Sequence, residues 1–93
     1  MVKEVHAAHI LVKTQDEAQG VLDGLKSGKS FAQLAQEKST CPSGKRGGDL
    51  GWFGRGRMVR EFESAAFGLK KGDTSGPVKT EFGWHIIKCL DTR

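Results

Sequence analysis

Apolar residues recur with a two-residue period at the beginning of the chain. Residues 2–12 contain no Gly or Pro and are rich in residues that suit a pleated, half-buried segment, so they predict a first strand. Alternation puts Val5, Ala7, His9 and Leu11 on one face of this strand. The opposite face carries His6, Ala8, Ile10 and Val12. We therefore expect His9 in an apolar row and His6 at the surface.

Two segments that follow have the three-to-four-residue period of amphipathic helices. Thr14 and Glu17 have the spacing of a capping box, and the apolar positions behind them continue until Gly28. Ser30 and Gln33 repeat this spacing at the start of a second, shorter helix. We expect these two helices to cover one face of a sheet.

The second half of the chain has shorter apolar runs separated by Gly and Pro. They predict, in order, a loop over residues 39–48, a strand over 50–53, a helix over 58–69, a turn over 73–77, a strand from Val78, a tight turn over 81–83 and a strand over 84–90. The last strand puts His85, Ile87 and Cys89 on one face. The order β-α-α-β-α-β-β predicts an α+β fold with a largely antiparallel, four-stranded sheet.

Length and composition indicate one globular domain that spans residues 1–93. Hydrophobic residues make up 37% and charged residues 28% of the chain, and no apolar run approaches the length of a membrane span or a signal peptide. We therefore expect a cytoplasmic protein. Cys41 and Cys89 lie far apart without a Cys-x-x-Cys spacing, so we expect two free thiols, with no disulfide framework and no metal site.

The net charge of +4 is concentrated in the middle of the sequence. Between Lys38 and Arg60 there are six basic residues and one acidic residue, Asp49. Such a segment could attract acidic peptides or nucleic acid. It could equally be a solvated loop that its charges keep in water.

Several kinds of chemistry are excluded or left open by the motifs. The chain has neither a Gly-x-Ser-x-Gly elbow nor a phosphate-binding Gly-x-x-x-x-Gly-Lys-[Ser/Thr] loop. Cys41 could be a nucleophile with a histidine base, because the basic residues around it would favour the thiolate. Taken alone, His9 and His85 are more often hydrogen-bonded core residues than catalysts. Leu50, Met58 and Phe62 could converge on a concave apolar site for a small ligand.

Motifs from both ends and the middle of the chain point to one family. They are His9-Ile-Leu-Val-Lys13, Ser39-Thr-Cys41, Gly47-Gly-Asp-Leu-Gly51, Gly56-Arg-Met58-Val-x-x-Phe62, Gly76-Pro-Val78 and Thr80-x-Phe-Gly-Trp-His85-Ile-Ile-Lys88. In this order they resemble the parvulin family of peptidyl-prolyl cis/trans isomerases, across nearly the whole chain. The resemblance implies a parvulin-like fold, a four-stranded antiparallel sheet surrounded by helices.

The resemblance also implies the site residues. Leu50, Met58 and Phe62 would form a pocket for the proline ring, and Phe82 would close one side of it. His9 and His85 match a pair of histidines on adjacent strands, with Thr80 in the same polar network. Cys41 matches a loop position that is Cys in some parvulins and Asp in others. No cofactor and no metal would be required.

We therefore predict an enzyme, a rotamase that acts on X-Pro bonds of peptides and of unfolded or flexible protein segments. It would favour the twisted amide without forming a covalent bond. Phosphate-specific parvulins carry a basic cluster after the first strand, whereas this chain has Lys13 followed by Asp16 and Glu17, so phosphate recognition is not expected. We expect a monomer. The alternatives are a chaperone-like or nucleic-acid-binding module on a parvulin fold and, third, a zinc site.

Overall fold

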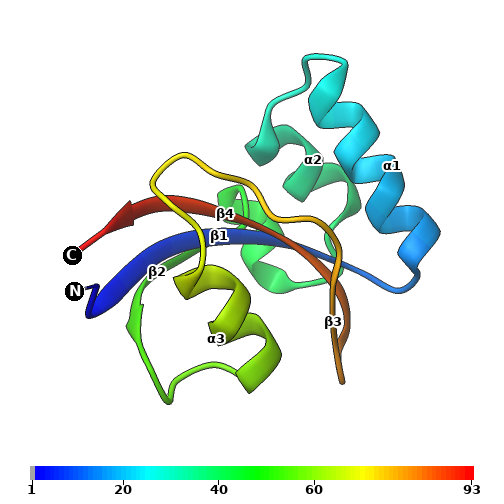
Figure 1. Ribbon diagram of the computed structural model, residues 1–93. Helices are drawn as coiled ribbons and strands as arrows, with labels where there is room; N and C mark the ends of the chain where they lie inside the picture. The colour runs from blue at the N-terminus through cyan, green and yellow to red at the C-terminus, as the bar shows by residue number, and fades with distance from the viewer. Residues whose placement is uncertain (1) are drawn as a thin grey trace.

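The fold of residues 2–93 was obtained as a computed structural model (Figure 1). Its elements are β1 (Glu4–Val12), α1 (Gln15–Lys26), α2 (Phe31–Lys38), the 3₁₀ helix η1 (Pro42–Arg46), β2 (Asp49–Gly54), α3 (Arg60–Phe67), β3 (Val78–Thr80) and β4 (Gly83–Thr92). The predicted β-α-α-β-α-β-β order and the α+β class are confirmed.

The four strands form one antiparallel sheet with the order β2-β1-β4-β3. The first and last strands are therefore neighbours at its centre, although they lie at opposite ends of the sequence. Their register pairs His9 with Ile87 and Leu11 with His85. Side chains at these four positions point to the same side of the sheet, because residues paired across antiparallel strands share a face.

One face of the sheet is covered by α1 and α2, as expected from their apolar stripes (Figure 1). Thr14 and Ser30 cap the two helices by accepting the backbone N–H groups of Glu17 and Gln33, as the capping pattern predicts. The buried residues of this layer are Ala8, Ile10, Val12, Ala18, Val21, Phe31, Leu34, Ala35 and Ile86. Their burial leaves this face of the sheet sealed.

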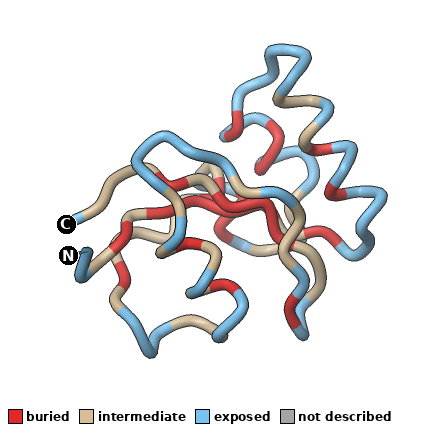
Figure 2. The backbone as a smooth tube through the Cα atoms, in the orientation of Figure 1, coloured by how far each residue is buried: buried red, intermediate tan, exposed pale blue. Residues whose placement is uncertain are grey.

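The other face carries a second, smaller core under the short helix α3. Its buried residues are Val5, Ala7, Phe53, Phe62, Ala66, Ile87 and Cys89. Figure 2 shows burial concentrated in the two central strands, with exposed connections around them. Because α3 spans only 8 residues, it covers part of this face, and the uncovered part is where the site lies.

The first strand begins two residues later than predicted and the last strand is longer than the predicted 84–90, and two other segments differ more. The loop over 39–48 contains η1, which has Pro42 at its start, where a missing N–H is tolerated, and Gly47 at its end with φ of 71°. The third helix is shorter than the predicted 58–69 and runs from Arg60 to Phe67. It has no side-chain cap at its start, and the apolar pattern alone did not fix its ends.

No helix among residues 2–93 is long and apolar enough to cross a bilayer.

Candidate active site

A cavity of about 400 Å³ opens on the α3 side of the sheet. It is lined by His9, Leu11, Cys41, Leu50, Arg57, Met58, Val59, Phe62, Phe82 and His85. Every site residue named from the sequence is in this lining except Thr80, which lies behind His85 and contacts it directly. Apart from the histidines, Cys41 and Arg57, all of these side chains are apolar, and the volume is typical of a small-ligand site.

The apolar wall comes from three parts of the chain that the fold brings together. Leu50 lies on β2, Phe62 on α3, and Met58 on the connection between them. This connection is held against α3, because the Glu63 carboxylate accepts the backbone N–H of Gly56. Gly56 has φ of 88°, a conformation that favours glycine. Glu63 therefore helps to fix the position of Met58.

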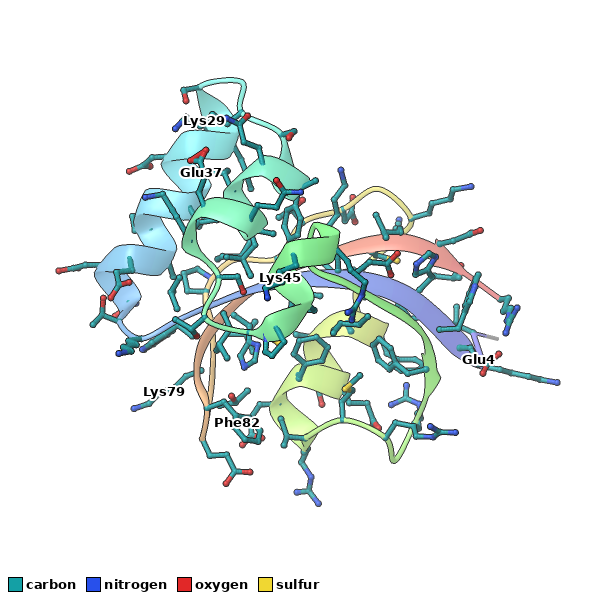
Figure 3. The ribbon with its side chains drawn as sticks, turned by 180° about the vertical axis from the view of Figure 1, so that it is seen from behind. Glu4, Lys29, Glu37, Lys45, Lys79 and Phe82 are labelled. Atoms are coloured by element: carbon teal, nitrogen blue, oxygen red, sulfur yellow. The ribbon has the colours of Figure 1, made fainter. Side chains whose placement is uncertain are left out.

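Phe82 lies at the turn between β3 and β4 and lines the cavity. It is 63% exposed, in contrast to Phe62, which is 3% exposed. Figure 3 shows Phe82 at the end of this turn, away from the helices α1 and α2. Phe62 is part of the core as well as of the cavity wall, so the two aromatic residues have different surroundings.

His9 and His85 form a buried pair on the floor of the cavity. Their Nδ1 atoms are 2.9 Å apart, and the rings are nearly parallel with centroids 5.1 Å apart. The ring of Phe62 stands edge-on against both imidazoles, at centroid distances of 5.5 and 5.2 Å. The pair is thus in direct contact with the apolar wall and has a fixed orientation.

Thr80 completes this hydrogen-bond network. Its Oγ1 lies 2.7 Å from His85 Nε2 and accepts the backbone N–H of Phe82. Since that acceptance leaves the hydroxyl proton free to be donated, we assign Thr80 as the donor to His85 Nε2 and His85 Nδ1–H as the donor to His9 Nδ1. His9 then carries its proton on Nε2, a buried atom with no hydrogen-bond partner.

Burial keeps both histidines neutral. Desolvation, followed by the proximity of His85, lowers the pKa of His9 from 6.5 to about 4. Desolvation also lowers the pKa of His85. At neutral pH the cavity floor therefore presents two polar but uncharged rings.

The loop before η1 places Cys41 at the edge of the cavity. The backbone N–H of Thr40 donates to the Leu11 carbonyl at 2.8 Å, and that of His9 donates to the Gly48 carbonyl at 2.9 Å. The segment is thereby attached to β1 at both of its ends. The buried hydroxyl of Ser43 donates to Cys41 Sγ at 3.3 Å. Cys41 itself is half-buried, and Cys89 is buried in the core; both are free thiols.

A metal centre finds no support in the part of the chain that the structure describes. Among residues 2–93, no three His, Cys, Asp or Glu side chains are close enough to bind a metal ion. The third histidine, His6, is half-buried, and its Nε2 lies 2.8 Å from Asp49 Oδ1. The backbone N–H of Gly51, and then His6, lower the pKa of Asp49. This pair lies apart from the cavity.

Comparison with known proteins identifies the family. The family model for rotamases, described as the PPIC-type PPIase domain, matches residues 6–91. The chain belongs to this family. It is thus a peptidyl-prolyl cis/trans isomerase domain, and the predicted relationship to parvulins is confirmed.

Relatives of this PPIC-type domain include both larger and single-domain proteins. The foldase protein PrsA of Geobacillus kaustophilus is 53% identical over 89 residues, which are 95% of this chain and 32% of PrsA. The solution structure of NmPin, the parvulin of Nitrosopumilus maritimus, has 46% identity and a TM-score of 0.86, with 97% of this chain and 98% of NmPin covered. CsPin of Cenarchaeum symbiosum has 53% identity and a TM-score of 0.83, with 97% and 94% covered. The chain spans about a third of the length of the PrsA relatives.

Three residues that line the cavity of this PPIC-type domain were not predicted from the sequence. Leu11, Arg57 and Val59 line the cavity but were not predicted to do so. Leu11 is two residues from His9 on the same face of the strand, and Arg57 and Val59 flank Met58. Strand alternation was therefore a usable signal for Leu11. Nothing in the local pattern distinguished Arg57 from the other basic residues nearby.

Proposed function

We propose that this domain isomerises X-Pro bonds in unphosphorylated peptides and flexible protein segments, without forming a covalent intermediate. The proposal rests on one observation, the apolar cavity whose floor is a neutral, hydrogen-bonded histidine pair. In this proposal Leu50, Met58, Phe62 and Phe82 hold the proline ring, and His9, His85, Thr80 and Cys41 surround the amide.

The reaction requires rotation about one bond, the amide C–N bond that precedes proline. Amide resonance imposes a barrier of roughly 18–20 kcal/mol, while the cis and trans forms of X-Pro differ by only about 1 kcal/mol. An enzyme needs to bind the twisted amide more tightly than either planar form. No bond is broken, so neither an activated nucleophile nor a cofactor is needed.

The two parts of the cavity would contribute in different ways. The apolar wall holds the ring while the carbonyl side of the bond turns. Removing the amide from water also disfavours its planar, charge-separated resonance form, in which the barrier originates. The uncharged histidine pair fixes the shape of the floor and avoids placing a full charge beside the rotating carbonyl.

Cys41 would act on the electrostatics at the edge of the cavity and not as a nucleophile. Its sulfur accepts the Ser43 hydroxyl, a role that a carboxylate can also fill. We expect Cys41→Asp to retain isomerisation of an Ala-Leu-Pro-Phe peptide within about tenfold of the wild type, as measured by exchange NMR. Complete loss in Cys41→Asp, together with a covalent adduct detected by mass spectrometry in the wild type, would contradict this role.

Absence of phosphate selectivity is supported by the connection between β1 and α1. It contains one cation, Lys13, and the first turn of α1 carries Asp16 and Glu17, all exposed. Two carboxylates beside a single lysine do not favour a phosphate dianion. Isomerisation of a phosphoserine-Pro peptide should therefore be no faster than that of Glu-Pro, and a large preference for the phosphopeptide would overturn this part of the proposal.

A nucleic-acid-binding module is less well supported. Arg55 is engaged by Glu63 at 3.4 Å and lies 4.4 Å from the Phe67 ring centroid. Lys45, Arg46 and Arg57 line three different cavities, and the cavity of Arg46 also contains the carboxylate of Asp49. A DNA titration across salt concentrations, run beside the peptide assay, separates the two functions.

We also propose that residues 1–93 act as a monomeric, single-domain cytoplasmic isomerase. Two free thiols suit a reducing compartment. The exposed large apolar side chains are Val2 and Phe82 among residues 2–93, too few for an extensive interface. Sedimentation analysis of the purified chain tests the monomer, and fractionation of the source cells tests the location.

A further inference from the structure

A second cavity adjoins the proposed proline pocket. It measures about 320 Å³ and is lined by Gln36, Ser39, Thr40, Cys41, Pro42, Gly44 and Lys45. Cys41 belongs to the lining of both cavities, so the two lie side by side at this residue. The lining of the second cavity is about half polar, whereas the lining of the first is almost entirely apolar. A peptide that fills the first cavity can therefore extend into a site of different chemistry.

Lys45 gives this second cavity its charge. It is exposed, it is the charged residue of the lining, and it takes part in no ion pair within residues 2–93. Figure 3 shows Lys45 projecting from η1. The carboxylates nearest in sequence are already engaged, Glu37 by Lys29 at 3.7 Å and Asp49 by His6 at 2.8 Å.

The backbone beneath the second cavity is fixed. A Cβ atom at Gly44 would lie 2.7 Å from the Ala35 carbonyl oxygen, so η1 packs directly on α2 at this point. Gly44 also donates its N–H to the Cys41 carbonyl at 2.9 Å. The cavity is thus formed before any ligand arrives, which lowers the entropic cost of binding.

The position of the isomerised X-Pro bond decides which substrate residue enters the second cavity. The rotating carbonyl belongs to the residue before proline, and the proposed function sets Cys41, which lines both cavities, beside the amide. We propose that the second cavity is the subsite for this preceding residue and that the Lys45 ammonium selects a carboxylate there. This inference rests on the proposed function and adds a substrate class, peptides with Glu or Asp before proline.

The test compares Ala-X-Pro-Phe peptides with X = Glu, Gln, Lys and Leu, using exchange NMR at low salt. Glu and Gln are nearly isosteric, so their ratio of kcat/KM isolates the charge. We expect a Glu/Gln ratio of about two to five, the size of an exposed ion pair, which falls toward one in 0.5 M NaCl. Lys45→Gln should bring the ratio to about one at low salt, and Lys45→Glu should make Lys the preferred residue.

Arg46→Gln is the matched control. Arg46 is the next residue of η1, is equally exposed, and lines a different cavity with Lys88 and Asp49. The subsite assignment requires that this variant keep most of the Glu preference. Equal loss in Lys45→Gln and Arg46→Gln would indicate diffuse surface charge and overturn the assignment, as would a wild-type ratio of one.

The outcomes for the subsite and for the enzyme are separable. Turnover of the Leu peptide without any Glu preference refutes the subsite and leaves the proposed function intact. Failure to accelerate isomerisation of any of the four peptides refutes the proposed function itself.

Discussion

The two faces of the sheet differ in how completely they are covered. On one face, α1 and α2 bury an apolar layer that includes Ile10, Leu34 and Ile86. On the other face, the single short helix α3 leaves a cavity beside Phe62. Three buried polar residues, His9, Thr80 and His85, belong to this second side. The two faces therefore have different roles. The sealed face, under α1 and α2, supplies the larger apolar core, and the open face, under α3, supplies the candidate site.

Phe62 shows where the two roles overlap. It is 3% exposed, packs against Phe53 in the smaller core, and also contacts both histidines. Removing its ring would create a cavity as well as destroy the wall, so a loss of activity in Phe62→Ala could not be separated from unfolding. Met58, which is half-buried at the rim, is the better test of the pocket.

The largest effect is expected in the sealed face. Leu34 is fully buried and packs against Gly24 of α1. Leu34→Ala should lower the free energy of unfolding by about 3 kcal/mol, a large share of the total for a domain of this size. The denaturation midpoint in urea measures this loss. Phe82→Ala, on the exposed mouth of the open face, is the stability control and should change the midpoint by less than about 0.5 kcal/mol.

Low pH should lower the free energy of unfolding through His9 on the open face. His9 has a folded-state pKa of about 4, below its ordinary 6.5, so the unfolded chain takes up a proton at a higher pH than the folded protein does. The His9 contribution to stability is therefore present above pH 6.5 and is lost as the pH falls from 6.5 to about 4, by roughly 3 kcal/mol.

Unfolding in urea at pH 7, 6, 5 and 4 measures this slope. His9→Asn, which removes the buried ionisable group, should flatten the curve. An unchanged slope in this variant would show that the acid sensitivity arises elsewhere. Isomerase activity should stay level between pH 7 and 8, because burial lowers the pKa of both histidines and so favours their neutral forms there.

Truncation of the pocket wall should lower activity more than stability. Met58→Ala removes apolar contact from the ring site, and we expect kcat/KM for a Leu-Pro peptide to fall at least about tenfold, or ~1.4 kcal/mol. Its stability should fall by no more than about 1 kcal/mol, since Met58 is only half-buried.

Leu25→Ala is the matched control for Met58, because Leu25 is also half-buried but packs on the sealed face. It should lose similar stability and keep its activity. Equal activity in Met58→Ala and the wild type would remove Met58 from the pocket.

The smallest effect is expected for Glu63, which supports the apolar wall of the cavity. Glu63→Ala removes the acceptor for the Gly56 N–H and the partner of Arg55. We expect a loss of about 1 kcal/mol in stability and a rise of a few fold in KM, because the segment that carries Met58 becomes less well fixed. Glu61→Ala, an exposed change in the first turn of the same helix, should reproduce neither effect.

Much of the fold could be predicted because its signals are local. Strand alternation placed His9 and His85 on apolar rows, and the side-chain caps at Thr14 and Ser30 fixed the starts of α1 and α2. The helix α3 lacks such a cap, and its predicted ends were wrong by two residues on each side. The 3₁₀ helix η1 was predicted as a loop, because its Gly and Pro content is common to both.

Local sequence patterns predicted less of the site than of the fold. Leu50, Met58 and Phe62 were grouped because they are close in the sequence, but the residues alone could not tell a pocket from a core. The family resemblance supplied Cys41, Thr80, Phe82 and the pairing of the histidines. Leu11 was missed although it shares a strand face with His9, whereas Arg57 and Val59 were missed because their membership depends on how the connection between β2 and α3 lies over the sheet.

By itself, the sequence determined the class of fold, the face of the sheet that α1 and α2 cover and the grouping of Leu50, Met58 and Phe62 that forms one wall of the cavity. The family resemblance implied that the first and last strands are neighbours, but only the tertiary structure decided the geometry that brings His9 within hydrogen-bonding distance of His85 across 76 positions of the chain. The same packing keeps both rings neutral and leaves Lys45 beside a second cavity. Periodicity in the sequence indicates on which face of a strand or helix a residue lies. Distances between residues, desolvation and cavity shape arise only when separate elements pack together.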